Sequence, residues 1–449
     1  MTVRIEIRNI GLIKEADIQL DGLTVITGMN DSGKSTVGKT LFSLYHGMNF
    51  YEQEINYAAI EYLFETVNGF KNNIKQMGKH TKKNNIIDEI NDIYLKLDAI
   101  DDKLSDLLMF GFHENQIDEL EDITKKIQNL LYEIRNSELN NSSSIKNFVN
   151  TLREKISYIS SQNFNVEIKR NTVTQIFLNE FAGRIQNVYT KEDSYIKISD
   201  QDFFYLTAIS QNKVSDADEV IAEPINFKDV TFIDTPMVIN DLSGLRGSNK
   251  NRITRNHKDD LLDKLQNVRV KKNIIENTVY KEMVSEIDER INEILVGKIQ
   301  NSIGKFEYEI DGEKFDLSVL ASGLKSYSII RMLLDHGYLS RESLLIIDEP
   351  EVHLHPEWQL KIAELLVLIA KELKIKMILT THSPYFLQAL NVFNKKYCMK
   401  KKTHFYLARR EKSGAVLKNI DDNLDETYNL LAQPIIALKK FMDEQDENE

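Results

Sequence analysis

The pattern of apolar and polar positions predicts buried strands that alternate with helices. Short apolar or alternating runs predict strands at Val3 to Arg8, Leu23 to Thr27, Val230 to Ile233, Leu344 to Ile347 and Lys376 to Leu379. Two further runs, Phe306 to Ile310 and Lys314 to Leu317, flank Asp311-Gly312 and predict a hairpin. Because strands separated by helices usually build parallel sheets, the pattern favours an α/β fold with a largely parallel sheet.

A long helical segment interrupts this alternation. Between about Asn49 and Leu152 glycine is scarce and proline is absent. Apolar residues recur there at steps of four and three, from Ile86 to Leu107 and from Leu120 to Ile134, as in a coiled-coil seam. We expect an antiparallel helical hairpin that turns near Gly111; an ordinary helical subdomain without a binding role is an equal alternative. So narrow an apolar stripe is marginal in isolation, so we expect it to pack on a partner or on the rest of the chain.

Composition narrows the class of protein. No apolar run is long enough to span a bilayer, and the N-terminus MTVRIEIRNIG lacks the profile of a signal peptide. Cys398 is the only cysteine, so no intrachain disulfide can form. These features predict a cytoplasmic protein without a membrane partner.

The charge balance bears on nucleic acid as a partner. The formal net charge is −12, whereas a compact nucleic-acid-binding domain is usually basic. Basic clusters nevertheless occur at Lys71 to Lys83, Arg246 to Lys258, Arg269 to Lys272 and Lys395 to Lys402. A solvated surface is the commoner explanation of such clusters, and nucleic acid stays open as a partner.

A glycine-rich loop follows the second predicted strand. The segment GMNDSGKST, from Gly28 to Thr36, matches the P-loop pattern in full, and a predicted helix continues to Gly47. Glycines let the backbone N–H groups wrap around phosphate, and the helix N-terminus favours an anion. We expect Lys34 to contact the β- and γ-phosphates and Ser35 to bind Mg²⁺. The expected nucleotide-binding residues of this loop are Gly28, Asn30, Asp31, Ser32, Gly33, Lys34, Ser35 and Thr36.

Two carboxylates and a histidine follow two of the later strands. Asp348 and Glu349 end the run LLIIDE, and ligands of open α/β sheets bind at the carboxyl ends of such strands. We expect Asp348 to hold Mg²⁺ through water and Glu349 to orient or deprotonate the attacking water. His382, in TTHSP after the next strand, is expected to contact the γ-phosphate or that water. The predicted catalytic residues are therefore Glu349, His382 and Lys34.

A second anion-binding element is weaker by itself. Ser322 and Gly323 precede a predicted helix and could offer a hydroxyl and a helix N-terminus to an anion, although a Ser-Gly pair alone is only a helix start. His353 and His355 do not predict a metal site, because no cysteine or further histidine lies at ligand spacing.

In their order along the chain, these segments resemble those of a known family. GMNDSGKST, ASGLKSY, LLIIDEPEVHLHPEWQ and ILTTHSPYFLQAL resemble the P-loop, the signature, the Walker B motif with the D-loop, and the H-loop of ABC-type ATPases. The opening VRIEIRNIGLIKEADIQLDGLTVITG and the phrase DEPEVHLHP are similar to those of the AAA/OLD-like group, which is related to SMC and RecF.

The resemblance implies an ABC-type ATPase head with a mixed or parallel sheet and an inserted α-helical hairpin region. We expect a first lobe with the P-loop in residues 1–48, a mainly helical insertion in 49–200, the remainder of the first lobe with a helical segment in 201–304, and a second lobe with the signature, Walker B, D-loop and H-loop in 305–449.

The resemblance also implies a homodimer or higher oligomer. Two ATP molecules, each with Mg²⁺, would lie between the P-loop of one protomer and Ser322-Gly323 of the other. This signature departs from LSGGQ, with Lys325 and Ser326 in place of the usual residues. Gln175 and Gln186 are weak candidates for a Q-loop.

The resemblance leaves several functions open. About 60 residues follow Ala389, too few for a C-terminal TOPRIM nuclease. The chain thus resembles the stand-alone ATPase of two-gene anti-phage systems, such as the Septu ATPase with its HNH nuclease or the PARIS ATPase with its TOPRIM toxin. The first hypothesis is an ATPase that regulates such an effector. The alternatives are a RecF- or SMC-like ATPase that binds DNA in repair or tethering, and a binding module whose ATP is structural.

Overall fold

The computed structural model shows two compact units. It describes residues 3–81, 83–110, 116–200, 204–216, 227–242, 256–269, 274–293, 297–302, 305–425, 427–433 and 437–438. The first unit holds the described residues within 1–49, 173–246 and 254–449, and the second holds those within 50–172. We call them the head and the helical unit.

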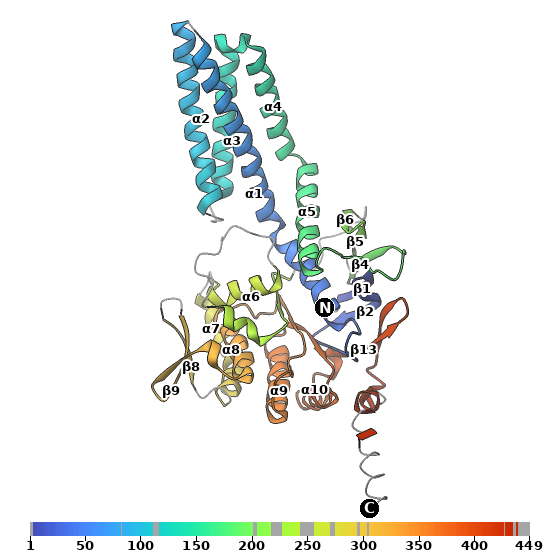
Figure 1. Cartoon of the computed structure of the whole chain (residues 1–449). Coiled ribbons are helices and arrows are strands. Elements are labelled where there is room, and N and C mark those ends of the chain that lie inside the picture. Colours follow the sequence, from blue (N-terminus) through green and yellow to red (C-terminus); the bar gives the residue numbers. More distant parts are fainter. Residues whose placement is uncertain are drawn as a thin grey trace, which may run out of the picture. The chain divides into compact units, whose positions relative to one another are not determined.

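A mixed sheet organises the head (Figure 1). Its strands are β1 (Val3–Ile10), β2 (Ile13–Leu20), β3 (Leu23–Thr27), β4 (Ser194–Ser199), β5 (Phe204–Ser210), β6 (Lys213–Asp216), β7 (Asp229–Ile233), β11 (Ser343–Ile347), β12 (Lys376–Thr381), β13 (Thr403–Glu411) and β14 (Gly414–Asn419). Across the described residues the order is β6-β5-β4-β1-β2-β14-β13-β3-β12-β11-β7. The head therefore has an α/β fold with a mixed sheet, as the resemblance implied.

The parallel half of the sheet carries the strands that end in the conspicuous motifs. The strands β7, β11, β12, β3 and β13 run parallel to one another. Every residue of β3, β7 and β11 is buried, which explains why their sequences are mostly apolar and do not alternate with charged residues. The carboxyl ends of parallel strands meet at one edge, so the residues that follow these strands lie near one another. The strands predicted at Val230, Leu344 and Lys376 are confirmed.

Helices cover both faces of this sheet. The head contains α6 (His257–Gln266), α7 (Ile274–Asn292), α8 (Ser322–Asp335), α9 (Pro356–Glu372) and α10 (Pro384–Lys396). Leu345 and Ile347 of β11 pack into a core with α6 to α10. Leu344 and Ile346 pack into a second core, which includes residues of α1 (Lys34–His80) and α5 (Gln162–Glu180). This alternation places one apolar core on each face of the sheet.

A small antiparallel sheet corrects one prediction and confirms another. It consists of β8 (Lys298–Ser302), β9 (Lys305–Ile310) and β10 (Glu313–Asp316). The sequence from Leu261 to Ile299 predicts one or two further helices, and this prediction is wrong at its end, because Lys298 and Ile299 pair with β9. The hairpin at Asp311-Gly312 is confirmed, and both residues have positive φ, as its tight turn requires.

In the helical unit, neighbouring helices bury the apolar seams that the sequence predicts. Its elements are the later part of α1 (Lys34–His80), then α2 (Asn84–Phe110), α3 (Gln116–Asn136), the 3₁₀ helix η1 (Glu138–Asn141), α4 (Ser143–Ile159) and the start of α5 (Gln162–Glu180). The seams of α2 and α3 share a core with Ile60, Leu63, Val67, Phe70 and Ile74 of α1 and with Ile145, Val149 and Leu152 of α4. The cover comes from helices of this chain, and the predicted turn at Gly111 lies outside the described residues.

The later part of α5 belongs to the head. Val173, Ile176 and Phe177 pack into its core, and β4 pairs with β1. Residues 173–200, which the sequence placed in the helical insertion, therefore form part of the head. Among the helices that the structure describes, none combines the length and apolar character that a bilayer-spanning segment needs.

Two glycines of α1 should respond differently to the same substitution. A Cβ added to Gly69 meets no heavy atom within 4 Å, whereas one added to Gly47 lies 2.9 Å from Cγ2 of Val173. We expect Gly69→Ala to raise the free energy of unfolding by about 0.5–1 kcal/mol, because alanine loses less backbone entropy in a helix. Gly47→Ala should lower it. Urea denaturation followed by circular dichroism measures both changes, and equal effects would contradict the close packing at Gly47.

Candidate active site

A tight loop connects β3 to α1. A Cβ on Gly28 would lie 2.5 Å from the carbonyl oxygen of Ala408, so this position requires glycine. Asp31 and Gly33 have φ values of 61° and 83°, and loops with such residues can turn successive N–H groups toward an anion. The helix begins at Lys34, directly after the second glycine. The local fold is therefore the one that a phosphate-binding loop needs.

The other loop residues differ in exposure. Asn30 is exposed, Ser32 is buried and Thr36 is half-buried on the first turn of α1. The exposed carboxylate of Asp31 pairs with Arg410 of β13. This ion pair joins the loop to the neighbouring strand.

The ammonium group of Lys34 lies within the loop. Its Nζ donates hydrogen bonds to the carbonyl oxygens of Gly28, at 3.1 Å, and Met29, at 3.0 Å. The side chain is 4% exposed, and Nζ lies 3.6 Å from Oε1 of Glu349. The loop and the end of β11, which are far apart in the sequence, thus meet at this ammonium group.

Asp348 lies beside the first turn of α1. Its backbone N–H donates to the carbonyl oxygen of Ile233, at 2.8 Å, and its carboxylate accepts hydrogen bonds from the hydroxyls of Ser35 and Thr380. Burial raises the pKa of Asp348, and these two hydrogen bonds oppose part of that rise. A hydroxyl and a carboxylate side by side are hard oxygen donors of the kind that Mg²⁺ binds, together with phosphate oxygens.

Glu349 forms the link between Lys34 and His382. Its φ of 46° is unusual for a residue with a side chain, and its N–H donates to Oγ1 of Thr380, at 3.1 Å. Such left-handed residues persist where surrounding contacts fix them. Oε1 of Glu349 lies 3.0 Å from Nδ1 of His382, whose side chain is 41% exposed. Lys34, Glu349 and His382 therefore form one solvent-accessible cluster.

Ser322 and Gly323 begin helix α8. The Ser322 hydroxyl donates to the carbonyl oxygen of His353, at 2.9 Å, so its partner is the segment after β11 and not the P-loop. A Cβ on Gly323 would lie 3.0 Å from the ring of Trp358. No side chain caps this helix N-terminus, because the preceding residue is Ala321. A pocket of about 470 Å³ opens here, lined by Tyr308, Ile310, Ala321, Ser322, Gly323, Leu324, His353, Leu354, His355 and Trp358.

The residues that depart from the usual signature have structural partners. Lys325 is buried, and its Nζ donates to Oδ1 of Asn240, at 2.8 Å. Ser326 lines a small cavity with Asp348 and Glu349. At about 20 Å³ this cavity has room for about one water molecule.

The two glutamines considered for a Q-loop lie elsewhere. Gln186 donates to Ser194 and to the carbonyl oxygen of Ile209, in the antiparallel half of the sheet, and Gln175 is exposed on α5. On the side opposite β12, β11 pairs with β7, and Asp234 follows β7. This acidic residue, and not a glutamine, lies at the carboxyl end of that strand.

A buried charged cluster beside β7 was not predicted from the sequence. His257 lies between Glu180, 2.7 Å from Nδ1, and Asp234, 3.1 Å from Nε2. Burial alone would lower the pKa of His257, but the two carboxylates raise it to about 9. The three residues share no local motif, so only the structure brings them together; the one sequence signal is Asp234 in the phrase FIDTP.

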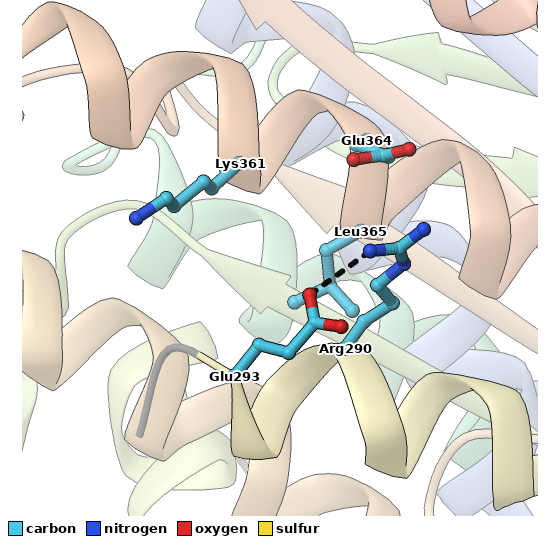
Figure 2. Close-up of a pocket in the computed structure, with 5 residues that line it drawn as sticks. All are labelled: Arg290, Glu293, Lys361, Glu364 and Leu365. Atoms are coloured by element: carbon cyan, nitrogen blue, oxygen red, sulfur yellow. Dashed lines mark hydrogen bonds and ion pairs between the residues drawn. The ribbon is translucent and has the colours of Figure 1, made fainter. Parts of the chain in front are cut away.

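Two other features of the head do not form ligand sites. A surface cavity of about 170 Å³ is lined by Arg290, Glu293, Lys361, Glu364 and Leu365 (Figure 2). Its charged groups are already paired: Arg290 with Glu293, Lys361 with Glu357, and Glu364 with Lys396. Within the described part of the chain, no three His, Cys, Asp or Glu side chains are grouped to hold a metal ion.

Comparisons with known proteins identify a family. A family model described as an AAA ATPase domain matches residues 1–387. The Septu protein PtuA of Bacillus thuringiensis is 37% identical over 86 residues, which cover 19% of this chain and 21% of that protein. The alignment thus spans about a fifth of that relative's length.

Solved structures with similar folds include SMC heads. The SMC head domain from Thermotoga maritima is 8% identical, with a TM-score of 0.39, over 93% of this chain and 97% of that chain. The Smc head domain with a coiled coil and joint derived from Pyrococcus yayanosii is 9% identical, with a TM-score of 0.36, over 97% of this chain and 100% of that chain.

Proposed function

This chain belongs to the family of AAA ATPase domains, and from that membership we propose that it binds and hydrolyses ATP between two head units to regulate a separate effector, as part of a bacterial anti-phage defence system. The observation that carries the catalytic part is the meeting of Lys34, Glu349 and His382 beside Asp348. The family membership supports ATP hydrolysis in general. The homodimer and the effector go beyond what family membership supports.

The geometry suggests a role for each residue of the cluster. Lys34 and the N–H groups of its loop would bind the β- and γ-phosphates. Ser35 and Asp348 would hold Mg²⁺, which neutralises phosphate charge when bound. Glu349 would accept the proton of the attacking water, because its carboxylate is solvent-accessible and held by its neighbours. His382, beside Glu349, would contact that water or the γ-phosphate.

A second copy of the chain would complete the nucleotide site. The uncapped N-terminus of α8 offers N–H groups to an anion, and Ser322 is hydrogen-bonded away from its own P-loop. A partner's triphosphate is the anion that this helix end would receive. Because both copies would contribute the same two surfaces, the assembly would be a symmetric homodimer.

Mixing two inactive variants should test this arrangement. Lys34→Ala removes the P-loop lysine, and Ser322→Arg blocks the N-terminus of α8, so each variant alone should hydrolyse little ATP. A mixture should regain activity, since a mixed dimer pairs the intact P-loop of one variant with the intact α8 of the other. Phosphate release by the separate and mixed variants measures this. A mixture as inactive as its components, despite formation of mixed dimers, would contradict completion of the site by a second copy.

An effector encoded nearby is the proposed partner. The partial match to a Septu protein PtuA and the resemblance to stand-alone defence ATPases support it. We expect the natively expressed operon to yield a complex of this chain with a second gene product, such as an HNH or TOPRIM nuclease. Affinity purification followed by mass spectrometry would show it, and a chain purified repeatedly without that product would count against the proposal.

Direct DNA binding is the competing outcome. The structure provides little support for it, because several lysines of the basic clusters are paired with carboxylates: Lys71 with Asp98 and Asp101, and Lys396 with Glu364. Most of the cluster from Arg246 to Lys258 lies outside the described residues, and Lys258 itself lies 3.4 Å from Asp234. A salt series in a gel shift would reveal salt-sensitive, ATP-enhanced binding if the RecF- or SMC-like alternative holds.

A further inference from the structure

A buried histidine joins three elements of the head. His257 begins α6, Glu180 ends α5, and Asp234 follows β7. Both oxygens of Glu180 contact His257: Oε1 accepts from its backbone N–H and Oε2 from Nδ1, each at 2.7 Å. The side chains of Glu180 and His257 are 1% and 8% exposed. Charged groups this deeply buried are costly unless they are paired, so the contacts define a fixed arrangement.

Aromatic rings hold the imidazole in place. The ring of Phe232, from β7, lies 4.6 Å from that of His257, and the ring of Phe42, from α1, lies at 6.0 Å. With these rings on its sides and carboxylates at both nitrogens, the imidazole has little freedom to turn. Its Nε2 lies 3.1 Å from Oδ2 of Asp234, at ion-pair distance.

Asp234 belongs to a segment that borders the catalytic carboxylates. Ile233, just before it, accepts the N–H of Asp348 at 2.8 Å. Thr235 and Pro236, just after it, line the small cavity that Asp348 and Glu349 also line. A shift of Asp234 would displace its neighbours Ile233 and Thr235, which both line this cavity. The cavity has room for about one water molecule.

We propose that Glu180 and His257 are positioning residues for ATP hydrolysis, because they hold Asp234, and with it the segment Ile233–Pro236, against Asp348 and Glu349. The proposal rests on the ATPase function proposed above and adds a structural support for its catalytic edge. Neither Glu180 nor His257 touches the expected nucleotide. Their loss should therefore lower kcat and leave the KM for ATP nearly unchanged.

The charge of His257 gives the arrangement a pH dependence. The titratable groups around it are Glu180 from α5, Asp234 after β7, Lys258 from α6, and the pair of His46 from α1 with Asp260. Because the carboxylates raise the pKa of His257 to about 9, the imidazolium, paired with Glu180 and Asp234, is present at neutral pH. The attraction between this positive charge and Asp234 is complete below the ordinary histidine pKa and disappears as pH rises through about 9.

The experiment compares kcat, KM and their pH profiles in wild type, His257→Gln and Glu180→Gln. We expect His257→Gln to lower kcat about tenfold, a rise of about 1.4 kcal/mol in the activation free energy, because the segment Ile233–Pro236 is no longer held against Asp348 and Glu349. In Glu180→Gln the alkaline decline of kcat should begin about one pH unit lower, since one of the two carboxylates that raise the pKa of His257 is gone. A merely structural role would not move this limb.

A matched control and a measurement independent of activity complete the design. His404→Asn removes a second His–Asp pair, with Asp421, from β13, and should leave kcat unchanged. The imidazole signal that is missing from His257→Gln identifies His257 by NMR, and this signal should titrate near pH 9 in wild type and lower in Glu180→Gln.

The outcomes separate this inference from the proposed function. An active wild-type enzyme whose kcat is unchanged in His257→Gln, or whose alkaline limb is unmoved in Glu180→Gln, would overturn the inference and leave the ATPase standing. A wild-type chain without ATP hydrolysis would overturn the proposed function itself. If His257→Gln does not fold, the position of the alkaline limb of kcat in Glu180→Gln decides.

Discussion

Glu349→Gln should lower kcat for ATP hydrolysis by about 100-fold or more while ATP stays bound. Glutamine keeps the size of the side chain and its contact with His382 but cannot accept a proton from water. The contacts of Lys34 with the loop carbonyls of Gly28 and Met29 do not involve Glu349, so nucleotide affinity should be preserved. If two heads close over ATP, the variant should also accumulate as a nucleotide-bound dimer.

Single-turnover hydrolysis, nucleotide retention and size-exclusion chromatography measure these three effects. Glu351→Gln is the matched control: Glu351 lies two residues away, is buried and accepts a hydrogen bond from Thr381. Burial raises the pKa of Glu351. Glutamine keeps the size of this side chain and an oxygen that can accept the hydrogen bond from Thr381, so hydrolysis should stay close to wild type. Unchanged turnover in Glu349→Gln would require a different group to activate water.

The parts of the site that lie on local motifs could be predicted from the sequence. The P-loop, Asp348-Glu349 and His382 each follow an apolar run that forms a buried parallel strand. Parallel strands bring their carboxyl ends together, so the sequence also predicts that these segments meet. The observed contact between Lys34 and Glu349 follows from this rule and from the length of the lysine side chain.

The features that depend on distant pairing could not be predicted in this way. Strands β4 to β6 and β13 to β14 complete the sheet by pairing with β1, β2 and β3, which come from the start of the chain. The His257 cluster joins α5, β7 and α6 through single residues with no shared motif. The apolar stripe in the later part of α1 could be predicted, because its members follow helical spacing: Ile60, Leu63, Val67, Phe70 and Ile74. Their packing against the seams of α2 and α3 is tertiary structure, which the spacing does not reveal.

Lys34→Ala should weaken ATP binding by about 100-fold, which corresponds to roughly 3 kcal/mol, the upper range for hydrogen bonds to a charged group. The reason lies in the placement of Nζ: it is buried within the loop and lies where the N-terminus of α1 and the end of β11 meet. No other described lysine makes hydrogen bonds to the loop carbonyls of Gly28 and Met29, so we expect no substitute for its charge. Isothermal titration with ATP and Mg²⁺ measures the loss.

Lys361→Ala provides the control, because Lys361 is a surface residue of α9 paired with Glu357 and lies outside the loop. It removes the same charge from the chain and should leave ATP affinity unchanged. Thermal unfolding without nucleotide should show that Lys34→Ala still folds, while the stabilisation by ATP seen in wild type should vanish. Unaltered affinity in a folded Lys34→Ala variant would mean that the triphosphate binds elsewhere, and the roles assigned to Ser35, Asp348 and Glu349 would then lose their basis.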